Sequence, residues 1–191
     1  MRRRLFLPAL ISLVVAGTFW FLRASDRPAT PRVAGTILDS LHGVLVHDNG
    51  NMGNVSGRNV VDGYNVGLRY QCVEFVKRYY LEHYHHRMPN SYGHAKDFFD
   101  PAVADGARNT ARDLLQYTNA SATRPAVGDL LVFDGWKGNP YGHVAIISRV
   151  EDDAVEVVQQ NTGSTRAEFN LDHRDGKWIL DSPRILGRLR K

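Results

Sequence analysis

The second half of this chain is a series of short apolar and β-branched runs, and that pattern limits the folds open to it. Gly, Asp, Asn or Pro separates the runs, as expected for strands joined by short connections. A helical segment precedes them, so helices come first and strands afterwards. That order predicts an α+β domain with an antiparallel sheet. The expected strands are residues 130–133, 144–150, 154–160, 178–180 and 184–190.

The first half is expected to supply the helices that pack on this sheet. Residues 71–84 have the clearest helical pattern, with a broad apolar face and with Glu74 four residues before Arg78. Shorter helices are expected over residues 93–99 and 107–117. The remaining expectations are a short helix or turn over 36–41, a strand over 44–47 and a long loop over 48–68.

The chain has one cysteine, Cys72, at the start of the expected helix over residues 71–84. A thiol is an effective nucleophile as thiolate, and the unpaired N–H groups of a helix N-terminus stabilise that charge. A buried structural thiol is the alternative, since free cysteine is usually buried. We favour a reactive thiol because a loop precedes it, a helix begins at it and a histidine follows in a later strand.

Of eight histidines, His143 has the setting of a catalytic base. It begins a strand-like run after a turn that ends in Gly142, and glycine permits the close approach of another segment. A histidine satisfied within the core is the alternative. Cysteine at a helix tip with histidine on a strand is the geometry of a thiol hydrolase. His83, His85 and His86 are expected to form a solvated helix end rather than a metal site, because zinc spacing with a second ligand cluster is absent.

A catalytic histidine needs a partner that orients its ring. The strand that follows His143 ends in Gln159, Gln160 and Asn161. Side chains alternate along a strand, so Gln159 and Asn161 are expected on one face and Gln160 on the other. A side chain of this group is expected to accept a hydrogen bond from the imidazole. The alternative is a polar strand end that enters a turn.

The N-terminal segment is the most apolar part of the chain. Three arginines at positions 2–4 precede an apolar run over residues 5–22, close to the roughly 20 residues that cross a bilayer as a helix. Basic residues in front of the run predict that this end stays in the cytoplasm. We therefore expect residues 1–24 to be a single transmembrane anchor. A cleaved signal peptide is the alternative, because small residues lie at positions 15–17.

The distribution of charge supports this division. The formal net charge is +4, and residues 1–24 hold four arginines and no acid, so the remainder is formally neutral. A neutral domain lacks the basic footprint of a nucleic-acid-binding protein, and we expect no nucleic acid partner. Residues 25–34 are expected to be a linker, and residues 35–191 a single folded domain.

Four separate phrases match a known family in the same order. They are Y-Q-C-V-E-F at 70–75, G-D-L-L-V-F-D at 128–134, N-P-Y-G-H-V-A-I-I at 139–147 and V-V-Q-Q-N at 157–161. The chain resembles the CHAP family, the cysteine, histidine-dependent amidohydrolases/peptidases. Within that family it is most similar to the amidase domain of glutathionylspermidine synthetase/amidases, which share a G-T-x-L-like start and a closing I-L-G. The likeness covers about residues 35–189.

The resemblance implies a papain-like α+β fold of the CHAP and NlpC/P60 kind, with N-terminal helices packed on an antiparallel sheet. It implies that Cys72 is the nucleophile and His143 the base, and that Asn161 matches the family's asparagine. The family usually has glutamate where this chain has Gln159. A neutral amide can still fix the histidine tautomer, but it stabilises an imidazolium less than a carboxylate does.

Three further side chains complete the expected site. By analogy with papain-like enzymes, the Gln71 side chain is a candidate oxyanion donor beside the Cys72 backbone N–H. Tyr70 and Tyr141 adjoin the cysteine and histidine motifs and are candidates for substrate contact. The expected chemistry needs no metal or organic cofactor.

The expected function is thiol-dependent amide hydrolysis outside the inner membrane of a bacterium, by a domain held at the membrane or secreted if the N-terminal segment is cleaved. Peptidoglycan offers the abundant amides in that space, so a wall peptide is the first candidate substrate. Glutathionylspermidine or a related small polyamine amide is the second. A catalytically inactive binding module on the same fold is the third interpretation.

Overall fold

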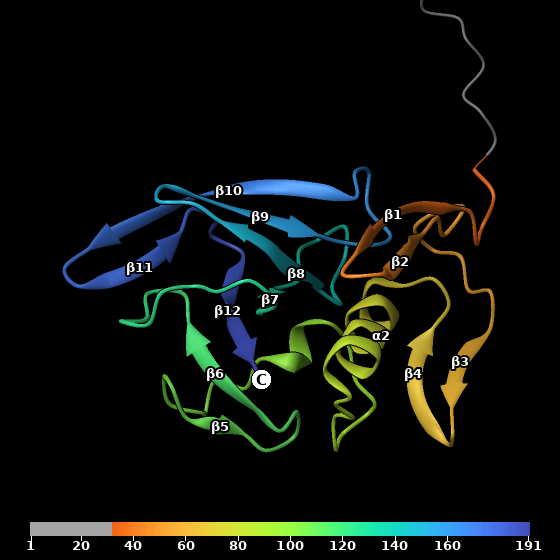
Figure 1. The fold of residues 1–191 in the computed structure, drawn as a ribbon, viewed down its shortest axis with the longest axis horizontal. Coiled ribbons are helices and arrows are strands. Elements are labelled where there is room, and N and C mark those ends of the chain that lie inside the picture. The colour runs from red at the N-terminus through yellow and green to blue at the C-terminus, as the bar shows by residue number, and fades with distance from the viewer. Residues whose placement is uncertain (1–31) are drawn as a thin grey trace, which may run out of the picture. The chain divides into compact units, whose positions relative to one another are not determined.

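An eight-stranded antiparallel sheet organises residues 32–191, the part of the chain that the computed structural model describes (Figure 1). Every pair of neighbouring strands is antiparallel. The order across the sheet is β11 (Lys177–Leu180), β10 (Arg166–Arg174), β9 (Ala154–Val158), β8 (His143–Val150), β7 (Leu130–Phe133), β12 (Ile185–Arg190), β6 (Leu114–Thr118) and β5 (Arg108–Asn109).

The central strands are buried on both faces, which is why their sequences are continuously apolar rather than alternating. In β7, Leu130 and Val132 belong to a core shared with the helix, while Leu131 and Phe133 belong to a second core on the opposite face. Strand β8 divides its side chains between the two cores in the same way. The site therefore rests on strands that cannot shift register without exchanging the two cores.

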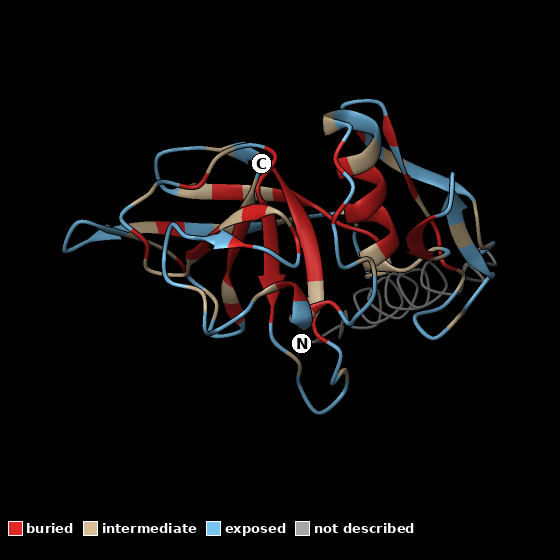
Figure 2. Ribbon diagram, turned by 90° about the horizontal axis from the view of Figure 1, so that it is seen from below, coloured by how far each residue is buried: buried red, intermediate tan, exposed pale blue. Residues whose placement is uncertain are grey.

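One α-helix, α2 (Cys72–Tyr84), covers the first of these faces. Phe75, Val76, Tyr79 and Tyr80 are fully buried, and the buried side of the helix is visible in Figure 2. The helix contacts β8, β4 and β2. The predicted helix over residues 71–84 is thus confirmed.

Two β-hairpins flank this helix, and they correct two expectations. The first pairs β1 (Ile37–Leu41) with β2 (Val44–His47), so the expected helix or turn over 36–41 is a strand. The second pairs β3 (Arg58–Val61) with β4 (Tyr64–Leu68), so the expected long loop over 48–68 is largely a hairpin. Gly67 adopts φ +146° and lies against the first turn of the helix, where a Cβ atom would come within 2.9 Å of Glu74 Cα.

The prediction of two short helices between residues 93 and 117 is wrong. The expected fold had several N-terminal helices, whereas residues 32–191 contain one α-helix. Within the described residues, 93–99 holds only a 3₁₀ turn, η1 (Lys96–Phe98), and 107–117 forms strands β5 and β6. Pairing of β6 with β12 decides this, since tertiary contacts override a weak local pattern. Strand β10 was not predicted, although its residues alternate between polar and apolar side chains as in a half-buried strand.

The transmembrane anchor or signal expected over residues 1–24 lies outside the described residues, as does most of the expected linker. Within residues 32–191, no helix has both the length and the apolar character needed to cross a membrane.

Candidate active site

The Cys72 thiol lies where the helix meets the sheet. Helix α2 begins at this residue, after Gln71 in an extended conformation, so Cys72 belongs to the first turn, whose N–H groups have no partner within the helix. Backbone N–H groups of Val144, Val73 and Cys72 itself act on the thiol and lower its pKa, against the larger effect of burial. Since Val144 follows His143 in β8, the cysteine and the histidine strand are in direct contact.

His143 is placed by the pairing of two strands. It lies opposite Phe133 at the end of the β7–β8 pair. Gly142 precedes it with φ +76°, and a Cβ atom there would lie 2.4 Å from the Phe133 carbonyl oxygen. A side chain at position 142 would therefore displace the turn that delivers the imidazole to the site, which accounts for the glycine noted in the sequence.

Gln159 contacts the imidazole, as one of the sequence expectations had it. Its Oε1 lies 3.0 Å from His143 Nε2, while its own Nε2 donates to the Ser164 carbonyl at 3.1 Å. The second bond fixes the orientation of the amide and directs its oxygen at the histidine. An acceptor at that point requires the proton on Nε2, which leaves Nδ1 as the free acceptor of the ring.

Burial keeps both reacting groups neutral at rest. Desolvation raises the pKa of the Cys72 thiol, and the backbone N–H groups of Val144 and Val73 oppose this only in part. The pKa of His143 is lowered to about 4, chiefly by burial and further by the charge of Arg184, although the Gln159 hydrogen bond opposes the shift. Desolvation thus opposes the thiolate expected at the helix tip, and that thiolate stays a prediction.

Asn161 does not share the histidine contact. Strand β9 ends at Val158, and Asn161 has a left-handed backbone with φ +63°, so the alternation expected along a strand no longer applies. Its Nδ2 donates to Gln71 Oε1 at 2.6 Å and to the Met52 carbonyl at 3.1 Å. Asn161 thus positions the residue before the cysteine, and its catalytic role stays a prediction.

The Gln71 amide is held by its surroundings rather than directed into open space. Its Nε2 donates to the carbonyls of Asn54, at 2.8 Å, and Met52, at 3.4 Å. Both hydrogens of the amide are engaged in this arrangement. The proposed oxyanion role of Gln71 would require this side chain to turn, and it stays a prediction.

Gln160 is a positioning residue that the sequence analysis assigned only to the opposite face. It is 1% exposed. Its Oε1 accepts from the His47 N–H at 2.7 Å, and its Nε2 donates to Glu74 Oε2 at 3.1 Å and to the Gln71 carbonyl at 3.2 Å. Gln160 therefore joins the β1–β2 hairpin, the start of the helix and the residue that holds His143. Its place beside Gln159 was the only sequence signal for this role.

The two tyrosines differ in their surroundings. Tyr70 packs on His47, with ring centroids 5.0 Å apart, and its backbone N–H donates to Asn49 Oδ1 at 3.0 Å. Tyr141 is 57% exposed and packs against His94 at 4.6 Å between centroids. Tyr141 is thus available to a ligand two residues from His143, and substrate contact by either tyrosine remains a prediction.

The histidines at the end of α2 do not converge. His83 stacks on His42 with centroids 4.5 Å apart, whereas His86 is buried and lies 2.9 Å from the Arg112 carbonyl. The expectation of a solvated terminus is therefore wrong for His86. Between residues 32 and 191, no three His, Cys, Asp or Glu side chains are grouped as a metal site.

Comparison with known proteins adds family information to this geometry. The sequence model of the CHAP domain matches residues 62–161, which are 100 of the 191 residues. The matched range includes the cysteine, the histidine and the three polar residues that follow strand β9.

Three characterised proteins share part of the sequence. Trypanothione synthetase of Crithidia fasciculata is 29% identical over 129 residues, which are 64% of this chain and 20% of that protein. Bifunctional glutathionylspermidine synthetase/amidase of Escherichia coli K12 is 29% identical over 106 residues, 54% of this chain and 17% of the relative. Glutathionylspermidine synthase of Crithidia fasciculata is 32% identical over 101 residues, which are 51% of this chain and 14% of that protein. The chain thus spans about a fifth or less of the length of these relatives.

Proposed function

This chain belongs to the CHAP family, and on that premise we propose that it is a thiol-dependent amide hydrolase with Cys72 as nucleophile and His143 as base. One observation carries the proposal. Cys72, at the start of the helix, packs against the core cluster that includes Val144, the residue after His143, while Gln159 occupies His143 Nε2 and leaves Nδ1 as acceptor. This arrangement supports a nucleophile at the helix start, a base at the start of β8 and an orienting residue just after β9.

Because both groups are neutral at rest, the proton moves as the bond forms. The sulfur attacks the amide carbon while the S–H proton passes to His143 Nδ1. The free N–H groups at the start of α2 donate to the oxyanion, and each such donor contributes about 10²–10³ in rate. The imidazolium then protonates the leaving nitrogen. Water, deprotonated by His143, releases the acyl group from the thioester and restores the thiol.

We propose peptidoglycan peptide amides as the first substrate class. This rests on the basic and apolar N-terminal segment, which would hold the catalytic domain outside the inner membrane or direct its secretion. A small polyamine amide such as glutathionylspermidine is the second candidate. It is favoured by the names of the relatives, which are glutathionylspermidine and trypanothione enzymes.

Digestion of purified sacculi by the full-length chain tests the proposal. Wild type is expected to release soluble muropeptides, and Cys72→Ala and His143→Ala to lower that rate by at least about 10³-fold, as expected when members of a catalytic unit are removed. His173→Ala is the matched control, because His173 is exposed and stacks on Trp178 instead. The control is expected to retain the wild-type rate.

The outcomes separate the candidates. Identical muropeptide profiles for wild type and Cys72→Ala would exclude murein as the substrate. Cys72-dependent hydrolysis of glutathionylspermidine, with intact sacculi, would move the assignment to the polyamine class. If the wild-type chain hydrolyses neither substrate, the proposed hydrolase function is contradicted and a binding module on the same fold is supported.

A further inference from the structure

Strand pairing brings an exposed arginine to the end of the sheet that holds His143. Ile185 in β12 pairs with Phe133 in β7, and Phe133 pairs with His143 in β8. Arg184 precedes Ile185, and its carbonyl accepts from the Asp134 N–H at 2.7 Å. Arg184, the start of the loop over residues 134–142 and His143 therefore share one end of three adjacent strands.

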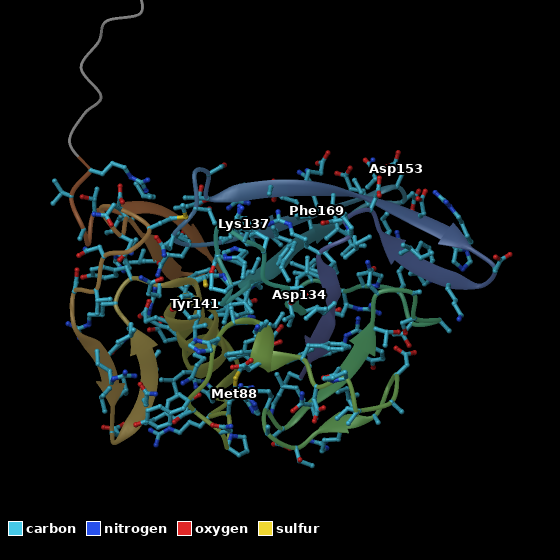
Figure 3. All side chains as sticks on the ribbon, turned by 180° about the vertical axis from the view of Figure 1, so that it is seen from behind. Met88, Asp134, Lys137, Tyr141, Asp153 and Phe169 are labelled. Atoms are coloured by element: carbon cyan, nitrogen blue, oxygen red, sulfur yellow. The ribbon has the colours of Figure 1, made fainter. Side chains whose placement is uncertain are left out.

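The loop over 134–142 holds the Arg184 guanidinium against an aromatic ring. The Arg184 guanidinium carbon lies 4.3 Å from the centroid of the Trp136 ring, which is 40% exposed. The loop is closed on itself by reciprocal backbone hydrogen bonds of 2.9 Å between Trp136 and Asn139. Figure 3 shows Asp134, Lys137 and Tyr141, labelled along the same loop. Stacking fixes the plane of a guanidinium and leaves its N–H edge free to donate.

Arg184 is an exposed arginine whose guanidinium has no hydrogen-bond or ion-pair partner among residues 32–191. The nearest acid along the loop, Asp134, directs Oδ1 to the Gly135 N–H at 2.7 Å. On the other flank, Lys96 donates its backbone N–H to the Tyr141 carbonyl at 3.0 Å and adds a second cation to this end of the sheet. The charge of Arg184 also contributes to the lowered pKa of His143. Arg184 is therefore a cation at this end of the sheet that is free to pair with an anionic ligand.

We propose that Arg184, held over the Trp136 ring, binds a carboxylate of the substrate beside the scissile amide, so that the enzyme prefers acidic peptides. This inference rests on the proposed hydrolase function and names its substrate class. A planar, pre-oriented guanidinium matches a carboxylate with two parallel hydrogen bonds, which a lysine at the same place cannot reproduce. Arg184 is then a specificity-determining residue.

Equilibrium binding to the full-length Cys72→Ala chain tests the carboxylate preference without turnover. The probes are the wall tripeptide L-alanyl-γ-D-glutamyl-L-lysine and glutathione, each also prepared with its carboxylates converted to carboxamides. At least one acid is expected to bind about tenfold or more tightly than its carboxamide, which corresponds to one charge-assisted contact. The acid that shows the preference identifies the source of the carboxylate.

Variants in the same background separate specificity from structure. Arg184→Gln is expected to remove the difference between acid and carboxamide, and Arg184→Lys to restore part of it. Arg124→Gln is the matched control, because Arg124 also lies over a tryptophan, 5.1 Å from the Trp178 ring centroid, on another part of the sheet. This control is expected to keep the full preference.

Three results would overturn the proposal: equal binding of acid and carboxamide, no measurable binding of either acid, or a preference that survives in Arg184→Gln. A merely structural role of Arg184 would weaken acid and carboxamide alike. If the binding preference is present but wild type hydrolyses nothing, the hydrolase proposal fails and the carboxylate site stands. If wild type hydrolyses a substrate but shows no carboxylate preference, the carboxylate site fails and the hydrolase proposal stands.

Discussion

Strand β7 joins two polar regions that are built in opposite ways. At its end, Phe133 pairs with His143, whose side chain is bonded to the neutral amide of Gln159. Before its start lies Asp129, a carboxylate only 1% exposed that is bonded to two arginines. One region holds its geometry with amides and the other with fixed charges.

The charged region ties the start of β7 to the last strand. Asp129 Oδ2 accepts from Arg188 Nε at 3.1 Å, and Oδ1 accepts from Arg190 Nε at 2.7 Å. Burial lowers the pKa of Arg188, and the negative charge of Asp129 opposes that shift. The attraction between these opposite charges offsets part of the cost of their desolvation.

The amide region faces a different demand, because charge must appear and disappear there during the proposed reaction. Gln159 and Gln160 hold their partners by hydrogen bonds that do not depend on the protonation of Cys72 or His143. Glu74, the one buried carboxylate in this support, is already paired with Arg78 at 2.8 Å. The comparison indicates that permanent charge is used for strand assembly and neutral amides for the site.

The largest effect is expected from breaking the charged region. Asp129→Ala leaves Arg188 buried without its counter-ion, and we expect the free energy of unfolding to fall by about 3–5 kcal/mol. Denaturant unfolding measures this loss. The hydrolysis rate per folded molecule is expected to stay at the wild-type value, and a rate that falls in step with stability would show that the two regions are not separate.

Compared with Asp129→Ala, the Gln160→Ala variant is expected to lose less stability and more activity. The change leaves Glu74 Oε2 and the His47 N–H without their partner, which costs about 1–3 kcal/mol for a buried group. Because Gln160 joins the helix start to the residue that holds His143, we also expect a lower rate per folded molecule.

Gln116→Ala provides the matched control for that variant. Gln116 is also fully buried, and its side chain bonds the Asp100 backbone at 2.7 and 2.9 Å, far from the site in the sheet order. A similar loss of stability with an unchanged rate is expected. If Gln160→Ala and Gln116→Ala change the rate equally, the positioning role proposed for Gln160 is contradicted.

The sequence predicted best those elements whose pattern is decided locally. The helix over 71–84 and the strands at 130–133 and 144–150 have continuous apolar faces, and the structure has them at nearly the same residues. Residues 107–117 carry no comparable pattern, and their strands form through pairing of β6 with β12 and of β5 with β6. Non-local pairing of this kind cannot be read from a window of neighbouring residues.

The same distinction applies to the site. Contact between His143 and Gln159 was foreseeable, because antiparallel strands that follow one another usually pair. The contacts of Gln160 with Glu74 and of Asn161 with Gln71 join segments about 90 residues apart in sequence. The protonation of the pair was not foreseeable either, because it depends on burial that the sequence alone does not specify.

The pH dependence of Cys72 alkylation by iodoacetamide tests the central claim most directly, since the chain has one cysteine and the signal is specific to it. For wild type, burial predicts a single transition above the ordinary thiol pKa of about 8.5. In Gln159→Glu, a carboxylate stabilises the protonated His143, so the transition is expected to fall by about one pH unit or more. Full reactivity of the wild-type thiol already at pH 5–7, as an approximate range for a His-paired thiolate, or an unchanged transition in Gln159→Glu would contradict a neutral pair oriented by Gln159.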